Sequence, residues 1–282
     1  MVKHIEMINL ISMAGLGRRF SEKGHKLPKP LIPVCGEPMI LKVIDCLPKA
    51  RKWIFIVRKE HIDEFFIDEI IKNKIPEAII VIDTDLIGGA SIFCAEKYID
   101  PNEDILVAGC DNGYIFSEEN FEKLKSSKKA DCILWTFTED QRLRNSPTSW
   151  GYPVLERDNE TIENMSIKIP ISSDPYFDHA VTATFYISSA KILYEAVRKM
   201  VKEDIKVNGE FYLDMLPVVL NMLGKKSVLF DVDLYIGWGT PEELYEFDRT
   251  RYYYRSGKFS KMDLPEKIKG AWKIYFSKNE KN

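Results

Sequence analysis

The chain has 282 residues, of which 45% are hydrophobic and 29% charged, values typical of globular proteins and unlike those of disordered or fibrous chains. A net charge of -3 provides no general positive field for a nucleic-acid backbone, so no nucleic-acid partner is expected. The first ten residues lack a cleavage signal and no apolar stretch approaches the roughly 20 residues that span a bilayer, so we expect a cytoplasmic protein without membrane attachment.

Apolar segments of strand length recur along the first half of the chain, with helical patterns between them. The strand-like segments are residues 5–12, 53–57, 78–82, 105–108 and 132–137, and the helical stripes are residues 39–47 and 61–75. Strands that alternate with helices indicate an α/β fold, with a Rossmann-like mixed, mostly parallel sheet flanked by helices. Such sheets bind their ligands beyond the carboxyl ends of the strands, in the loops.

From about residue 151 the strand-like pieces become shorter. They lie at residues 152–155, 181–187 and 227–234, with a helical stretch at 191–201. We interpret this part as the second half of one domain. Beyond it, residues 249–282 combine three consecutive tyrosines with many lysines, and we expect a docked helical tail there, with membrane-surface or partner binding as the alternative.

A glycine-containing loop follows the first predicted strand. It contains Ala14, Gly15, Leu16 and Gly17. The two glycines let backbone amides approach an anion without a β-carbon in the way. Arg19 then offers a planar fork of donors to phosphoryl oxygens, and Lys29 is a point charge held between two prolines. The loop lacks the endings of a P-loop and of a dinucleotide fingerprint, so it predicts a phosphate site without favouring an ATPase or a dehydrogenase.

Several short motifs after this loop extend the pattern. They are Gly17-Arg18-Arg19-Phe20, Pro28-Lys29-Pro30-Leu31, Pro33-Val34 and Gly36-Glu37-Pro38-Met39. In order and spacing this compound motif resembles the signature of the sugar-phosphate nucleotidyltransferase family, and the resemblance continues more thinly to about Phe247. It implies a fold of the nucleotide-diphospho-sugar transferase type.

The resemblance also implies a division of the chain. Residues 1–248 would form the nucleotidyltransferase domain, with a nucleotide-binding half at 1–150 and an acceptor-binding half at 151–248. The remaining residues, 249–282, would be a basic, tyrosine-rich tail.

Roles for the nucleotide site follow from the same resemblance. Arg19 and Lys29 would be catalytic. The loop of Ala14, Gly15, Leu16 and Gly17 would bind the triphosphate, and the turn of Gly88, Gly89 and Ala90 would read the base with its backbone groups. A plain helix start with a glycine cap is the alternative interpretation of that turn.

A metal site is implied as well. Asp111 matches the aspartate with which the family binds catalytic Mg²⁺, an ion that prefers oxygen ligands; a turn-capping aspartate is the alternative. The family's second metal-binding aspartate corresponds to Gly237 here, so either one carboxylate and the phosphates hold the metal with water, or a different ligand fills the gap. Along an alternating strand Asp233 would share a face with residue 237, and we expect it to substitute.

Two residues resemble the family's acceptor site. Lys168 matches the lysine that holds the acceptor phosphate, although Ile167 replaces the usual acid before it. Glu210, in Asn208-Gly209-Glu210-Phe211-Tyr212, would accept hydrogen bonds from acceptor hydroxyl groups; a solvated surface glutamate is the alternative.

The resemblance thus implies an EC 2.7.7 type enzyme that joins the nucleoside monophosphate of CTP, UTP or dTTP to a phosphorylated metabolite, above all a sugar 1-phosphate, and releases pyrophosphate. Such activity belongs to nucleotide-sugar and polysaccharide biosynthesis. Because the aspartate at 237 is missing, a cytidylyltransferase with a non-sugar acceptor and a non-catalytic nucleotide-binding domain stay open. A scaffold protein that uses the tail is a further alternative, and a homo-oligomer is also open.

Overall fold

The computed structural model describes residues 7–84, 88–127 and 130–279. These residues form two compact units, each assembled from separate stretches of chain. The first unit holds the described residues up to Gly15 together with Lys49–Gly109 and Glu118–Asp231. The second holds Leu16–Pro48, Cys110–Ser117 and the described residues from Val232 onward.

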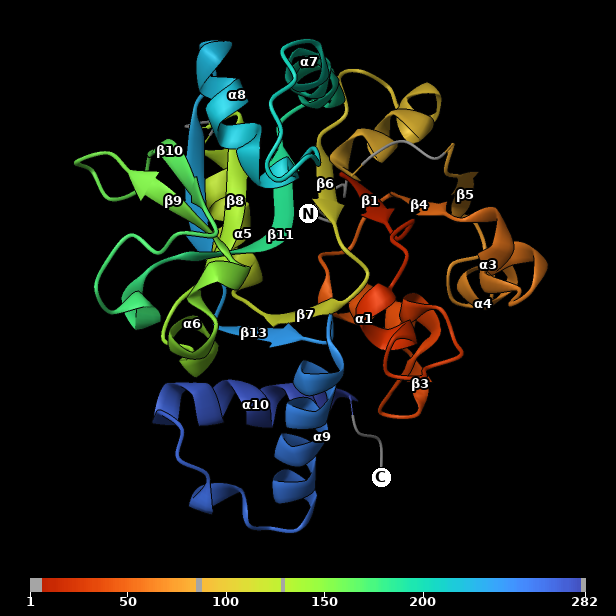
Figure 1. The fold of residues 1–282 in the computed structure, drawn as a ribbon, viewed down its shortest axis with the longest axis vertical. Helices are drawn as coiled ribbons and strands as arrows, with labels where there is room; N and C mark the ends of the chain where they lie inside the picture. Colours follow the sequence, from red (N-terminus) through yellow and green to blue (C-terminus); the bar gives the residue numbers. More distant parts are fainter. Residues whose placement is uncertain (1–6, 85–87, 128–129, 280–282) are drawn as a thin grey trace. The chain divides into compact units, whose positions relative to one another are not determined.

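The first unit is built on a seven-stranded sheet (Figure 1). The strand order is β12 (Ser227–Asp231), β8 (Cys132–Phe137), β11 (Ala180–Ile187), β6 (Ile105–Ala108), β1 (Ile8–Ser12), β4 (Lys52–Val57), β5 (Ile79–Ile82). Neighbouring strands are parallel except that β11 is antiparallel to both β6 and β8. The predicted mixed, mostly parallel sheet is therefore confirmed. A separate antiparallel pair joins β9 (Gly151–Leu155) to β10 (Ile162–Ile167).

Helices cover this sheet and close its core. They are α3 (Lys59–Asp63), α4 (Ile67–Lys74), the 3-10 helix η2 (Gly88–Tyr98), α5 (Glu118–Ser126), α6 (Gln141–Asn145), α7 (Ala190–Lys202) and α8 (Leu216–Met222). All four residues of β6 and all six of β8 are buried, as expected of strands covered on both faces. Leu193 and Val197 of α7 and Val219 and Leu220 of α8 pack into the same core.

Two sequence expectations within this region are wrong. The stripe at residues 61–75 is two helices, because Phe66 takes a left-handed conformation with φ of 54° and so interrupts a right-handed helix. The strand expected at 227–234 ends at Asp231, and a new strand, β13 (Leu234–Gly237), begins in the other unit. The strands at 105–108 and 132–137 have the predicted bounds.

The second unit contains two short antiparallel pairs and helices. The pairs are β2 (Pro33–Val34) with β3 (Glu37–Pro38), and β7 (Asn112–Ile115) with β13. The helices are α1 (Arg18–Ser21), η1 (Lys29–Leu31), α2 (Met39–Cys46), α9 (Pro241–Arg255), η6 (Phe259–Lys261) and α10 (Glu266–Asn279). Among the described residues no helix is both long and apolar enough to cross a membrane.

The C-terminal residues form part of the second unit's core. Phe247 of α9 packs against Trp272, Tyr275 and Phe276 of α10, with ring centroids about 6 Å apart. The region beyond residue 248 is helical as expected, but the boundary placed there falls inside α9. The two units are also composed differently from the proposed halves at 1–150 and 151–248, whose functional meaning stays a prediction.

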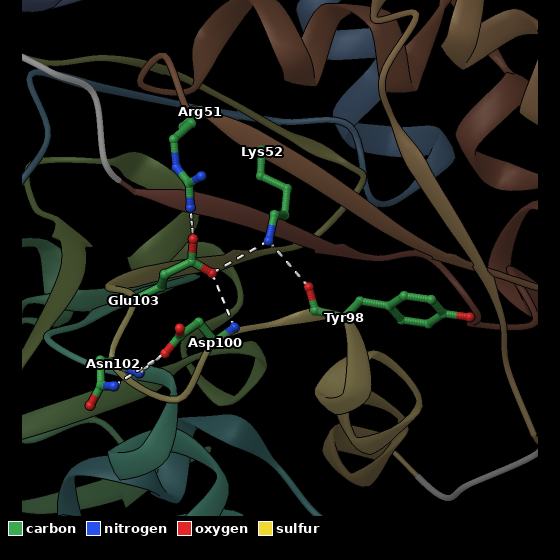
Figure 2. Close-up of polar contacts among 6 residues, drawn as sticks. All are labelled: Arg51, Lys52, Tyr98, Asp100, Asn102 and Glu103. Atoms are coloured by element: carbon green, nitrogen blue, oxygen red, sulfur yellow. Dashed lines mark hydrogen bonds and ion pairs between the residues drawn. The ribbon is translucent and has the colours of Figure 1, made fainter.

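A polar network ties the start of β4 to the loop before β6 in the first unit (Figure 2). The carboxylate of Glu103 forms ion pairs with Arg51 and with Lys52, whose Nζ is 3.4 Å away, and accepts a hydrogen bond of 3.1 Å from the backbone N–H of Asp100. Lys52 also donates to the carbonyl of Tyr98 at 3.3 Å. Burial, and then the charge of Arg51, lower the pKa of Lys52. Glu103 is thus the centre of the network.

We expect Glu103→Gln to lower the free energy of unfolding by about 1–2 kcal/mol, because the amide keeps an acceptor but loses both ion pairs. Chemical denaturation followed by circular dichroism measures this. Glu77→Gln is the matched control, since Glu77 is an exposed acid of the same unit. Equal stability of the two variants would contradict the role given to Glu103.

Candidate functional site

Gly17 of the predicted phosphate loop and Lys29, which lies between two prolines, are in contact in the second unit. Gly17 is in the left-handed region at φ 61°, and a β-carbon added to it would lie 3.3 Å from Cβ of Lys29. Both observations favour glycine at position 17. Gly17 precedes α1, whose Phe20 is buried and meets the ring of His25 edge-on at 5.1 Å. The loop is therefore fixed by packing as well as by backbone conformation.

Lys29 forms an ion pair with Asp111. Its Nζ donates to Oδ2 of Asp111 at 2.6 Å, and each side chain is 21% exposed. Burial acts to lower the pKa of Lys29, but the Asp111 carboxylate outweighs it and the pKa is raised. Lys29 therefore stays charged, and the predicted catalytic lysine and the predicted metal ligand are direct neighbours. The thiol of Cys110, next in sequence, has a pKa raised to about 12 by burial, which makes it unreactive.

The backbone around Asp111 is held by β13. Gly237 pairs with Asn112, and the N–H of Trp238 donates to the carbonyl of Asp111 at 2.8 Å. The ring of Trp238 is buried directly over Gly113, where an added β-carbon would lie 2.6 Å from the indole. Trp238 in turn packs edge-on against Phe247 of α9 at 5.7 Å. The aromatic core formed by the C-terminal helices thus positions Asp111.

A second carboxylate, which the sequence analysis did not assign, lies beside Asp111. A β-carbon on Gly239 would be 2.7 Å from Oδ2 of Asp111 and 3.3 Å from Oε2 of Glu243, so both oxygens face the same glycine. Thr240 caps α9 by accepting a hydrogen bond of 3.1 Å from the N–H of Glu243. The Thr-x-x-Glu spacing is that of a capping box, which explains a glutamate at position 243 by helix capping alone. The sequence therefore gives no signal that Glu243 could belong to a site.

Asp233 does not have the placement on which its assignment depended. The strand breaks at residues 232–233, so the alternation from Asp231 to residue 237 is lost. Asp233 is exposed, and Asp231, in the first unit, accepts a hydrogen bond of 2.8 Å from Thr136. No group of three or more acidic, histidine or cysteine side chains suited to a metal occurs among the described residues. A metal role for Asp233 stays a prediction without support from its surroundings.

The other residues of the predicted phosphate loop are at least partly accessible to solvent. Gly15 and Leu16 are exposed and Ala14 is half-buried, and a β-carbon on Gly15 would meet nothing within 4 Å. Arg19 is exposed as well. It nevertheless lies close enough to Lys29 for repulsion between the two positive charges to act to lower the pKa of Lys29. Ala14 and Gly15 belong to the first unit and Leu16 and Gly17 to the second.

In the first unit the glycines expected to read the base rest on the segment expected to contact the acceptor. The N–H of Gly89 donates to the carbonyl of Phe211 at 2.7 Å. Gly88, at φ 59°, and Gly89 have no room for a β-carbon, which would lie 2.8 Å and 2.9 Å from that same oxygen. Ala90 is buried at the start of η2. Since the Gly89 amide is engaged, base reading would use other backbone groups of the turn.

Lys168 is held in an unusual conformation near the same segment. It has a φ of 64°, its N–H donates to the carbonyl of Trp150 at 2.8 Å, and its Nζ donates to the hydroxyl of Tyr212 at 3.3 Å. A non-glycine residue in this region often marks a functional site. Glu210 is exposed beside a tight turn in which Asn208 and Gly209 both have positive φ.

Comparison with known proteins places these features in a family, although no family model matches the chain. The bifunctional protein GlmU of Fervidobacterium nodosum is 30% identical over 209 residues, which are 72% of this chain and 42% of that protein. GlmU of Thermotoga sp. (strain RQ2) is 27% identical over 210 residues, with the same coverage. The chain spans less than half the length of these curated relatives.

Solved structures share the fold. A nucleoside-diphosphate-sugar pyrophosphorylase from Vibrio cholerae RC9 aligns with a TM-score of 0.68 and 21% identity over 86% of this chain and 99% of that one. An inositol-1-phosphate CTP transferase from T. maritima aligns with a TM-score of 0.67 and 15% identity over 92% of this chain and 97% of that one. The resemblance inferred from the sequence is confirmed: the chain belongs to the nucleotidyltransferase family that includes the nucleotide-sugar pyrophosphorylases.

Proposed function

We propose that the protein transfers the nucleoside monophosphate of a nucleoside triphosphate to the phosphate of a small acceptor, above all a sugar 1-phosphate, and releases pyrophosphate. The observation that carries this proposal is the ion pair of Lys29 and Asp111, residues 82 positions apart that meet beside the glycine loop. A fixed cation next to a carboxylate is what binding of a polyphosphate and its divalent ion requires. We therefore favour this interpretation of the ion pair over a purely structural contact.

The proposed reaction is a single in-line displacement. An acceptor phosphate oxygen attacks the α-phosphorus, the new phosphorus–oxygen bond forms, and the bond to the β-phosphate oxygen breaks as pyrophosphate leaves. An acceptor phosphate is already ionised near neutral pH, so no protein nucleophile is needed. Lys29 and Arg19 stabilise charge on the phosphoryl oxygens, and the proline-bracketed backbone of Lys29 fixes that charge in advance.

The residues present suit a magnesium ion. Asp111, with Glu243 facing the same glycine, offers hard carboxylate oxygens, and Mg²⁺ is commonly held by one or two carboxylates with water and substrate phosphates completing its shell. When bound there, Mg²⁺ would neutralise charge on the triphosphate. Asp111 would then bind the metal ion in place of the Lys29 ammonium group. The ammonium group would be free to bind the phosphate.

The acceptor would be held in the first unit, where Lys168 offers a positioned cation. Sugar 1-phosphates are suggested by the nucleoside-diphosphate-sugar pyrophosphorylase and by a putative glucose-1-phosphate thymidylyltransferase from Bacillus anthracis that shares the fold with a TM-score of 0.64 and 17% identity. The inositol-1-phosphate CTP transferase, similar in fold, motivates the second candidate, a cytidylyltransferase with a non-sugar acceptor. CTP, UTP and dTTP are the proposed donors.

The deciding experiment incubates the protein with Mg²⁺, each of CTP, UTP and dTTP, and a panel of sugar 1-phosphates and non-sugar phosphate esters. We expect pyrophosphate release with one donor and one acceptor class. Stabilisation by a triphosphate in thermal denaturation without pyrophosphate release would indicate a non-catalytic nucleotide-binding protein. If no triphosphate stabilises the chain, the proposal fails.

We expect Lys29→Ala to reduce the rate of pyrophosphate release by about 10²–10³-fold, the usual cost of removing one group that stabilises transition-state charge. Steady-state assays of released pyrophosphate measure it. Lys26→Ala is the control, because Lys26 is exposed in the same loop. Circular dichroism checks that both variants are folded. A folded Lys29→Ala protein with a nearly normal rate would refute the role.

A metal series distinguishes the candidate carboxylates. In Asp111→Asn we expect the Mg²⁺ concentration for half-maximal activity to rise by more than the roughly tenfold that loss of an outer partner of a metal ligand costs. Glu243→Gln should raise it less, and Asp233→Asn should leave it unchanged. Titration of Mn²⁺ by calorimetry with CTP gives a readout independent of turnover. A larger effect at Asp233 than at Glu243 would reverse the assignment of the second carboxylate.

A further inference from the structure

The first unit contains an acid that none of the roles above uses. Asp214 lies in a short 3-10 helix, Leu213–Met215, between apolar residues. Its side chain makes no hydrogen bond or ion pair with any residue that the structure describes. Burial alone raises its pKa to about 6. The Asp214 side chain is half-buried, and a carboxylate partly removed from water without a compensating partner is costly, so its presence calls for an explanation in terms of a ligand.

The carboxylate of Asp214 lies against the start of β9. A β-carbon added to Gly151 would be 2.9 Å from Oδ2 of Asp214 and 3.3 Å from Cδ1 of Ile167. Any side chain at position 151 would therefore displace the carboxylate. Gly151 is paired with Ile167 across the β9–β10 ladder, so three segments of the first unit converge here.

The same three segments hold Lys168. Its N–H bonds to Trp150, the residue before Gly151, and its Nζ bonds to Tyr212, two residues before Asp214. Lys168 and Asp214 thus lie on neighbouring segments of one framework; the cation is hydrogen-bonded to Tyr212, whereas the acid has no side-chain hydrogen bond or ion pair among the residues described.

We propose that Asp214 binds a hydroxyl group of the acceptor whose phosphate is bound by Lys168, and so selects for polyhydroxylated phosphate esters. This inference rests on the proposed function. At neutral pH the carboxylate of Asp214 accepts charge-assisted hydrogen bonds from hydroxyl groups, whereas the amide of an asparagine offers only weaker, uncharged hydrogen bonds. Asp214 touches the acceptor but takes no part in bond making or breaking.

The test measures binding of four esters by calorimetry to the wild-type protein, Asp214→Asn and Glu163→Gln, an exposed acid on β10 that serves as the control. Glucose 1-phosphate, inositol 1-phosphate and glycerol 3-phosphate carry hydroxyl groups, and methyl phosphate carries none. We expect wild type and Glu163→Gln to bind one or more of the first three more tightly than methyl phosphate. Asp214→Asn should lose that preference by about tenfold or more, with methyl phosphate unaffected.

Unchanged preference in Asp214→Asn, or no preference in wild type, overturns the inference. So does tighter binding of phosphoethanolamine than of all three hydroxylated esters, which would assign the acid to a cation. The proposed function is judged separately by triphosphate binding and pyrophosphate release in wild type. If these occur while Asp214→Asn keeps its ester preference, only the role of Asp214 fails.

Stability provides a second readout. Because the folded-state pKa of Asp214 is raised, the unfolded chain holds fewer protons than the folded one between about pH 4 and 6, and stability falls as pH rises through that window. Asp214→Asn removes this cost, so its melting temperature should equal or exceed that of wild type at neutral pH, with the gap closing toward pH 4. A lower melting temperature at neutral pH would show a structural role and overturn the inference.

Discussion

The contact between Lys29 and Asp111 is the constraint on which the second unit depends. Each side chain is mostly removed from water, so each charge relies on the other to offset its lost hydration. The two residues come from distant parts of the chain, and both backbones are fixed independently, by flanking prolines on one side and by the N–H of Trp238 on the other. Opposite charges are thereby held at a set position, and in the proposed reaction this would supply the preorganised charge that electrostatic catalysis requires.

The C-terminal helices contribute to that condition at a distance. Trp238 lies between Gly113 and Phe247, and the rings of α10 enclose Phe247 from the other side. The resemblance seen in the sequence fades near Phe247, before most of this aromatic core. In physical terms the core nevertheless belongs to the site, because it fixes the backbone that carries Asp111.

The sequence predicts the sheet well and the carboxylates poorly. Residues 105–108 are an uninterrupted apolar run, and such a run is enough to recognise a strand that is buried on both faces. The pair of Lys29 and Asp111 was foreseen as two separate motif residues, but their contact was not, since pairing over 82 positions depends on the whole fold. The expectation for Asp233 depends on one continuous strand through residues 231–237, but the strand breaks at residues 232–233, and a break of two residues cannot be predicted from periodicity.

The hydrogen bond from Gly89 to the carbonyl of Phe211 joins the turn proposed to read the base to the segment proposed to contact the acceptor. Gly88 and Gly89 both pack against the carbonyl oxygen of Phe211, so neither segment can move without displacing the other. If the proposed roles hold, selectivity for the nucleotide and selectivity for its acceptor would be inherited as one property. Variation in residues 208–214 during divergence would tend to alter both at once, and efforts to retarget one substrate should sample positions on both sides of this link together.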